Sequence, residues 1–252
     1  MPVLFIGHGS PMNAIEDSEF SQAWAEAARL LPQPTAILCI SAHWQTTGTR
    51  ITAVEQPETI HDFHGFPAEL HQLHYPAPGS PELARLTVEA LQSSHARLDM
   101  EWGLDHGTWA VLCRMYPKAN VPVVQLSLDE RRSPAYHYQL GRELRQLRRK
   151  GVLIVGSGNI VHNLSQVVWA DTAYDWAMEF DTRIRERIES GDHEAILDPT
   201  RFGRLGRLAV PTIEHYLPLL YVLGAQHESE AVSFFAEKVT LGSMSMRSVR
   251  IG

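Results

Sequence analysis

The chain is poor in cysteine and has no long apolar run. Its 252 residues include two cysteines, Cys39 and Cys113, and neither belongs to a CxxC pair. Isolated thiols within apolar runs indicate reduced, buried side chains, which excludes a disulfide scaffold. No apolar stretch approaches the roughly 20 residues that a transmembrane helix needs. We therefore expect no membrane partner.

Positive charge is also scarce. There are 22 Lys and Arg against 29 Asp and Glu, which gives a formal net charge of −7. Nucleic acids and anionic membranes are bound by clustered Lys and Arg, and the one such cluster, at 142–150, falls at a predicted helix end. We therefore expect no nucleic-acid partner. The start MPVLFIGHGS has no positive region and no cleavage site of a signal peptide, which predicts a cytoplasmic protein.

Buried strands alternate with amphipathic helices along the chain. Apolar runs typical of strands covered on both faces lie at 2–6, 35–41, 121–127 and 152–155. Weaker strands are expected at 50–54, 96–100 and 244–251, and the last of these suits an edge position. Helical spacing of apolar residues occurs at 17–31, 80–91, 107–115, 133–150, 171–188 and 218–223. With no repeat or linker, this order predicts one α/β domain over 1–252, with a mostly parallel or mixed central sheet flanked by helices.

One long segment, 55–79, is rich in Pro, Gly and His and has no steady period. We expect it to be a loop without regular structure. Loops of this length are uncommon and often cover binding sites. Two of its four histidines, His61 and His64, are therefore candidates for contact with a substrate.

Histidine is abundant, at 13 of 252 residues. Predicted strands lead into His8 (GHGSP), His43 (SAHW) and His162 (GSGNIVHN), and His215 stands beside Glu214. In α/β sheets, ligands bind outside the carboxyl ends of the strands. We therefore expect these imidazoles to form a site for one divalent metal at that edge.

Three further features bear on this site. His106 lies among glycines and aromatic residues just before a predicted helix, where an imidazole could act on a substrate. Glu214 could complete a face of two histidines and one carboxylate, which is the usual arrangement for non-haem Fe(II). A set of neutral histidines would instead suit Zn(II). The residues alone leave open whether Glu214 or His215 points inward.

Six motifs together resemble one known family. They are GHGSP at 7–11, SAHW at 41–44, HDFHGFPAELHQLHYPAPG at 61–79, GLDHGTW at 103–109, GSGNIVHN at 156–163 and EHYLPLLYVLGA at 214–225. The set is similar to the class III (LigB-type) extradiol ring-cleavage dioxygenases, and within that family to the branch that acts on DOPA. The likeness extends over nearly the whole chain.

The resemblance implies a chemistry and a set of roles. The family cleaves a catechol ring beside the diol, using O2 and a non-haem divalent metal, here Zn(II) or Fe(II). It implies His8, His43 and His215 as metal ligands, and His162 as a fourth ligand or the catalytic base. It implies His106 as an acid–base residue. Ser10 of the GHGSP motif is a further candidate for contact with the substrate, beside His61 and His64. The implied partners are a small catechol and O2, and the protein is expected to be a monomer or a small homo-oligomer.

Two other functions fit part of the pattern. A tetrapyrrole metal chelatase also uses a GHGS strand end, but it predicts two related halves, and no internal repeat is present. A non-catalytic zinc protein predicts a closed site with four protein ligands, whereas an enzyme keeps one position open. The number of protein ligands and the space beside them therefore discriminate these alternatives.

Overall fold

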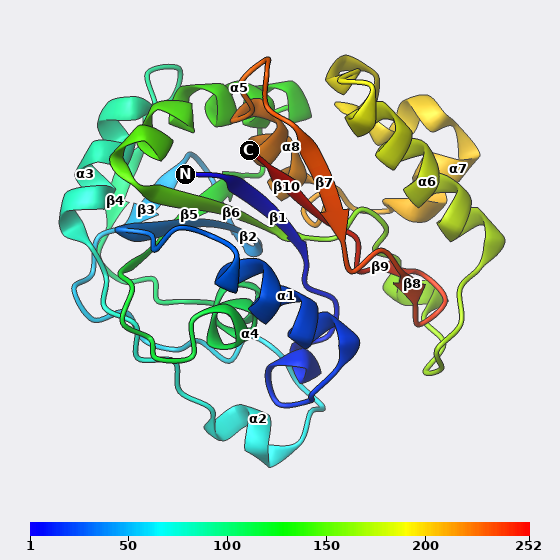
Figure 1. The fold of residues 1–252 in the computed structure, drawn as a ribbon, viewed down its shortest axis with the longest axis horizontal. Coiled ribbons are helices and arrows are strands. Elements are labelled where there is room, and N and C mark those ends of the chain that lie inside the picture. The colour runs from blue at the N-terminus through cyan, green and yellow to red at the C-terminus, as the bar shows by residue number, and fades with distance from the viewer.

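One eight-stranded mixed sheet crosses the molecule in the computed structural model, which describes residues 1–252 (Figure 1). The strands are β1 (Val3–Gly7), β2 (Ala36–Thr46), β3 (Arg50–Thr52), β4 (Arg97–Asp99), β5 (Val123–Asp129), β6 (Val152–Gly158), β7 (Val232–Phe235) and β10 (Ser248–Ile251). Their order is β4-β3-β5-β2-β6-β1-β10-β7. The central four, β5, β2, β6 and β1, are parallel, while β3 and β10 pair antiparallel to them. The predicted α/β fold is confirmed, and the sheet is mixed.

Alternate residues of the central strands enter two separate hydrophobic cores. On β1, Val3 and Phe5 belong to the larger core and Leu4 and Ile6 to the smaller one on the opposite face. Successive side chains of a strand point to opposite faces of a sheet. A strand buried on both faces therefore reads as a continuous apolar run, which is why these strands could be recognised from sequence.

Helices cover both faces of this sheet (Figure 1). The helices are α1 (Glu19–Arg29), α2 (Ala68–Gln72), α3 (Pro81–Ala90), α4 (His106–Met115), α5 (Pro134–Leu144), α6 (Asp175–Glu189), α7 (Arg204–Ala209) and α8 (Leu217–Gly224). Trp24 of α1 and Trp109 of α4 belong to the smaller core, whereas Leu140 of α5 and Leu220 of α8 belong to the larger one. The two pairs of helices thus lie on opposite sides of the sheet.

Local sequence signals account for several helix ends. Ser18 accepts a hydrogen bond from the backbone N–H of Ser21 and forms a capping box that begins α1. Pro81 and Pro134 occupy the first turns of α3 and α5, where a missing N–H costs nothing. Gly151 has φ of +81° and ends the helical segment before β6.

The structure corrects some boundaries. The 55–79 segment contains the short helix α2, so it is not wholly irregular. The last strand β10 is not at an edge, because β7, which the sequence did not reveal, pairs with it. Residues 244–245 instead form β9 (Met244–Ser245), which pairs with β8 (Val239–Thr240) in a separate ladder. β7 was missed because only Val232 and the two phenylalanines mark it, next to charged residues.

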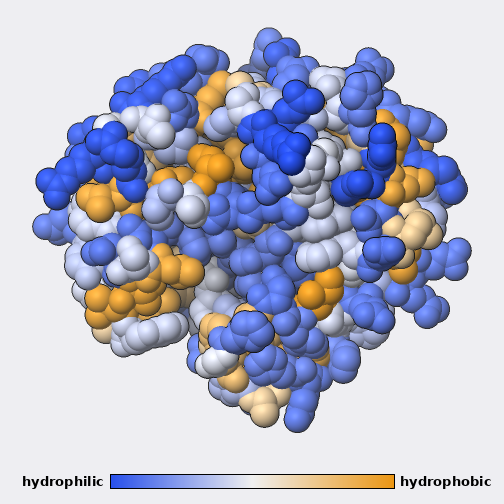
Figure 2. Space-filling model, turned by 180° about the vertical axis from the view of Figure 1, so that it is seen from behind, coloured by the Kyte–Doolittle hydropathy of each residue, from blue (hydrophilic) through white to orange (hydrophobic).

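The outer surface offers no large apolar face on the side opposite to Figure 1. There, hydrophilic residues surround small separate hydrophobic patches (Figure 2). No helix combines the length and the apolar character needed to cross a membrane.

Candidate metal centre

Three histidines from distant parts of the chain meet at the carboxyl edge of the sheet. One ring nitrogen from each of His8, His43 and His215 lies within 4.8 Å of the others. The Nε2 atoms of His8 and His43 are 3.3 Å apart. Three imidazole nitrogens at such spacing are the donor set that a first-row divalent ion prefers.

Each of the three reaches this point by a different backbone route. His8 directly follows β1, as predicted. His43 lies inside β2, which continues to Thr46, and the pairing of β2 with β5 shifts register between Ile40 and Gln45. The expected loop at His43 is therefore an irregular strand, and such irregularities re-aim side chains.

His215 comes from the turn before α8 and is held by contact with β6. The backbone N–H of Asn159 donates to the His215 carbonyl at 2.8 Å. A Cβ on Gly158 would stand 2.1 Å from that carbonyl oxygen, so only glycine permits the approach. Gly158, the last residue of β6, thus lets the His215 backbone dock on the strand end.

Ser157 determines which nitrogen of His8 carries the proton. The Ser157 hydroxyl donates to the carbonyl of Gly107 at 2.5 Å, so its proton is used there. It lies 2.9 Å from His8 Nδ1 and must accept from that nitrogen. His8 is therefore the Nδ1–H tautomer, and its Nε2 lone pair is free to face His43 and a metal.

A carboxylate plays the same part for His215. Nδ1 of His215 lies 3.1 Å from Oε1 of Glu214, to which it can donate. Glu214 therefore sits behind the ring, and the nitrogen it orients leaves the other one for a metal. The structure groups Glu214 with His162 and His215, and not with His8 and His43.

His162 lies beside the three histidines. Its ring stacks on that of His215, with centroids 3.5 Å apart and an interplanar angle of 6°. It is not a member of the group formed by His8, His43 and His215. It does line the adjacent cavity, which places it within the site but beside the three converging nitrogens.

His106 occupies the first turn of α4 and contacts Asp62. Nδ1 of His106 lies 3.0 Å from Asp62 Oδ1, in a charge contact whose angle is not that of an aligned hydrogen bond. The His106 backbone N–H donates to the same oxygen at 2.9 Å. Asp62 also lies 3.7 Å from Nδ1 of His43. One carboxylate thus stands behind two of the site histidines.

The start of α4 is tied to the sheet by a buried polar network. Asp105, the N-cap residue, is fully buried and accepts from Ser41 at 2.7 Å and from Gln125 at 2.5 Å. Ser41 also accepts from the backbone N–H of His43 at 3.2 Å. Because Ser41 and Ser157 are register partners on β2 and β6, two neighbouring serines fix α4 over the histidines.

The histidines open into a cavity of about 420 Å³, which we call the histidine cavity. Its remaining walls are mostly apolar and come from the segments around residues 8–11, 63–66, 164–169 and 241–244. Ser10, Phe63, Phe66 and Trp169 are among them. This volume is within the range of small-molecule sites, so the histidines face a space that can hold a substrate.

Burial and mutual repulsion keep these imidazoles neutral. Burial lowers the pKa of His43 to about 3 and that of His162 to about 4. Burial, with the neighbouring histidines, also lowers the pKa of His8 and of His215 well below the ordinary value. Burial raises the pKa of Asp62, but its hydrogen bonds and charge interaction with His106 outweigh this and the pKa is lowered. Neutral imidazoles beside an ionised carboxylate fit a divalent cation.

The two loop histidines that we expected to contact a substrate, His61 and His64, lie outside the histidine cavity. His61 Nε2 lies 3.0 Å from the Leu73 carbonyl, and its ring packs against Phe63 and Trp109. His64 is exposed and is not among the lining residues. The loop contributes Phe63 and Phe66 to the cavity instead. Ser10, by contrast, lines the cavity.

Several supporting residues escaped the sequence reading. Asp105 had a usable signal, since an Asp followed by a helical run is a common N-cap. The other three, Ser41, Ser157 and Asp62, belong to the recognised motifs. A motif does not show which distant atom a hydroxyl or a carboxylate will contact. Ser157 contacts residues 50 and 149 positions away along the chain, Ser41 contacts Asp105 at 64 positions and Asp62 contacts His106 at 44.

Comparison with known proteins agrees with this geometry. The family model described as the catalytic LigB subunit of aromatic ring-opening dioxygenase matches residues 2–250. A protein of Escherichia coli (strain K12) named 4,5-DOPA dioxygenase extradiol is 48% identical, covering 100% of this chain and 95% of the relative. One of the same name from Beta vulgaris is 38% identical over 98% of this chain and 94% of the relative. A crystal structure of an uncharacterized protein from Escherichia coli K12 has a TM-score of 0.85 and 42% identity, covering 100% of both chains.

The chain belongs to the LigB family of aromatic ring-opening dioxygenases. It is an extradiol ring-cleavage dioxygenase, an oxidoreductase of a metal-dependent family. This confirms the resemblance that the six motifs indicated and sets aside the chelatase and the non-catalytic zinc protein.

Proposed function

We propose that residues 1–252 form one catalytic domain that opens the ring of a DOPA-like catechol, with a divalent metal held by His8, His43 and His215. The observation that carries this is the convergence of three imidazole nitrogens within 4.8 Å at the wall of the histidine cavity. DOPA is named in the relatives, and a catechol ring with a short side chain suits a cavity of about 420 Å³.

Fe(II) is the ion we assign to catalysis. When bound, it can exchange an electron with O2, which Zn(II) cannot. The donor set accepts either ion, since three neutral imidazoles suit both. The choice of Fe(II) therefore follows from the reaction, whereas His8, His43 and His215 would hold either ion.

His162 is the residue we assign as the base that removes a proton from the diol. It lines the histidine cavity and is unprotonated at neutral pH, because burial lowers its pKa to about 4. An anionic oxygen forming beside it raises the pKa of an imidazole and so favours proton transfer. Its stacking on His215 keeps it next to the metal ligands.

His106 is the residue we assign as a proton donor at a later step. The Asp62 carboxylate lies 3.0 Å from Nδ1 of His106 and positions the ring at the cavity wall. The aromatic walls from Phe63 and Phe66 can pack on the catechol ring and exclude water. His61 and His64, which we expected to contact substrate, would act only if the loop carrying them moved.

One assay tests the proposal. Protein loaded anaerobically with Fe(II) is mixed with DOPA and other catechols, and O2 uptake and the yellow ring-opened product are followed, with Zn(II)-loaded protein as the parallel sample. We expect product and equimolar O2 uptake in the Fe(II)-loaded sample and neither in the Zn(II)-loaded sample. Confirmed metal occupancy without O2 uptake across the catechols would refute the proposed function, and turnover with Zn(II) would refute the choice of metal.

A further inference from the structure

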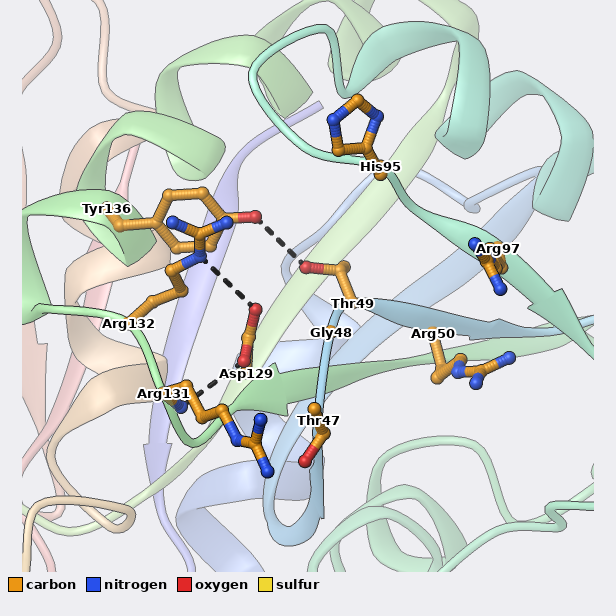
Figure 3. Close-up of a pocket in the computed structure, with 10 residues that line it drawn as sticks. All are labelled: Thr47, Gly48, Thr49, Arg50, His95, Arg97, Asp129, Arg131, Arg132 and Tyr136. Atoms are coloured by element: carbon orange, nitrogen blue, oxygen red, sulfur yellow. Dashed lines mark hydrogen bonds and ion pairs between the residues drawn. The ribbon is translucent and has the colours of Figure 1, made fainter.

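A second pocket, with four arginines among its ten lining residues, lies at the same carboxyl edge of the sheet. It has a volume of about 450 Å³ and shares no residue with the histidine cavity. Its lining residues are Thr47, Gly48, Thr49, Arg50, His95, Arg97, Asp129, Arg131, Arg132 and Tyr136 (Figure 3). We call it the arginine pocket. The catalytic function does not use it.

The pocket stands where α/β proteins place ligands. β2 and β5 are parallel neighbours that end at Thr46 and Asp129, and the turns that follow both strands form its wall. Helix α5 begins at Pro134, just past Arg132, and its N-cap residue Ser133 makes no side-chain cap bond. The carboxyl ends of strands and the start of a helix together favour an anion.

The pocket carries an excess of positive charge. Its only carboxylate, Asp129, is buried and already occupied: it accepts from the Arg131 backbone N–H at 3.2 Å and contacts Nε of Arg132 at 3.5 Å. These contacts are drawn in Figure 3. No ion pair in the structure involves Arg50, Arg97 or the Arg131 side chain. Three guanidinium groups thus remain without a counter-charge in a chain whose net charge is −7.

Two of these arginines are forced together by the sheet. Arg50 of β3 and Arg97 of β4 are register partners, and Figure 3 shows both on one side of the pocket. Like charges at facing positions of a sheet repel each other. An anion between them would replace that repulsion with attraction, because a guanidinium group donates two parallel hydrogen bonds to a carboxylate or a phosphate.

The neighbouring acids form no ion pair with these arginines. Asp99 and Glu101 line an adjoining pocket together with Arg50, yet no salt bridge joins them to it. Glu130 accepts a hydrogen bond from the Thr47 hydroxyl at 3.0 Å, outside the lining set. Asp99 accepts from the backbone N–H groups of Glu101 and Trp102 at 3.0 and 2.8 Å. At the opposite wall, Arg132 lies over the Tyr136 ring, 5.1 Å from its centroid, which holds that side chain in place.

We propose that the arginine pocket binds a small dianion, a phosphate monoester or a dicarboxylate, through Arg50, Arg97 and Arg131. The shared chemistry is a pair of negatively charged oxygens that can meet two guanidinium groups. A concave pocket of this size on an acidic chain suits a metabolite and not an extended polyanion.

The test is calorimetric titration of the metal-loaded protein with glycerol 2-phosphate and, separately, with succinate. We expect one of the two to bind one to one with Kd below about 1 mM. In the R50Q/R97Q variant that binding should weaken by about tenfold or more, since two charge-assisted contacts are lost. The matched control is R204Q/R207Q, which removes two exposed arginines that form no ion pair elsewhere on the surface.

The outcomes separate cleanly. Binding of glycerol 2-phosphate alone identifies a phosphate site, and binding of succinate alone identifies a dicarboxylate site. Absence of binding by both, or equal weakening in R204Q/R207Q, overturns the proposal. Should R50Q/R97Q fail to fold by circular dichroism, Arg131→Gln, on the exposed turn after β5, supplies the same comparison.

Discussion

The histidine cavity and the arginine pocket open at the carboxyl ends of neighbouring strands, yet they hold their functional groups in different ways. His8 and His215 are 3% and 6% exposed, whereas Arg97 and Arg131 lie at the surface. In the first, Ser157 orients the ring of His8 and Glu214 orients the ring of His215. In the second, no ion pair or side-chain hydrogen bond holds Arg50, Arg97 or Arg131.

That difference in burial decides charge. Desolvation disfavours the charged form of a buried imidazole, so the histidines are neutral at pH 7 and can donate lone pairs to a cation. Exposed guanidinium groups stay charged at any working pH and attract anions. One sheet edge therefore offers sites for ligands of opposite charge, and four predictions test that contrast.

The largest expected effect is the loss of the metal from the histidine cavity. His8→Ala or His43→Ala removes one of three ligands, and we expect each purified variant to retain little metal by mass spectrometry and to lose catechol cleavage. His64→Ala, an exposed histidine outside the cavity, is the control and should retain metal. Stoichiometric metal in both ligand variants would contradict the assigned centre.

A smaller effect is expected from Ser157→Ala. The variant removes the acceptor that holds His8 in its Nδ1–H form, and loss of such a supporting group weakens metal binding by roughly 10- to 100-fold. Competition with a chelator gives the Kd of the protein for the metal. Ser165→Ala, a serine of the 163–166 turn outside the cavity lining, is the control. An unchanged Kd for Ser157→Ala would show that the tautomer is set by other means.

The third prediction concerns the pH dependence of the stability of metal-free protein. The folded-state pKa values of about 3 for His43 and about 4 for His162 lie below the ordinary 6.5. Between those limits the unfolded chain binds protons that the folded chain does not, so stability falls as the pH drops from about 6.5 toward 4. Each pKa unit is worth about 1.4 kcal/mol per group.

Urea denaturation at several pH values measures this slope. Asp105 acts in the opposite direction, because burial raises its pKa to about 6 and the folded chain therefore takes up this proton more readily than the unfolded chain. It offsets the effect of only one of the several buried histidines. The His162→Asn variant should show a shallower slope, because it removes one titrating imidazole. A free energy of unfolding that stays level over this range would contradict the burial argument.

The smallest expected effect is that of salt. Raising NaCl from low to high concentration should weaken dianion binding in the exposed arginine pocket by about fivefold, because mobile ions screen surface charges. Metal retention in the buried histidine cavity should stay unchanged. Calorimetry and metal analysis on the same samples provide both readings. Equal sensitivity of the two sites would show that burial does not distinguish them.

Much of the fold could be read from residue patterns. The apolar runs at 2–6, 35–41, 121–127 and 152–155 correspond to β1, β2, β5 and β6, because strands buried on both faces leave a strong local signal. The exposed strand β7 left none. Its half-buried residues carry no continuous apolar run, and its pairing with β10 is a long-range contact.

The candidate site, like the fold, could be predicted from the sequence only in part. The motifs identified the residue types and the edge at which His8, His43 and His215 meet, since glycine-bounded histidines after strands are a local pattern. The local pattern could not show that Glu214 lies behind His215, nor that His162 stacks beside the group, because both depend on how the turn before α8 docks on β6.

By itself, the sequence determined the α/β class, the family and the histidines that converge at the sheet edge, because each of these follows from composition, periodicity or contiguous motifs. Tertiary structure alone decided the tautomer of His8, the carboxylate that stands behind His43 and His106, and the grouping of Arg50, Arg97 and Arg131. Those features arise where segments distant in the chain come within hydrogen-bonding or charge-interaction range, and a linear pattern does not encode such distances.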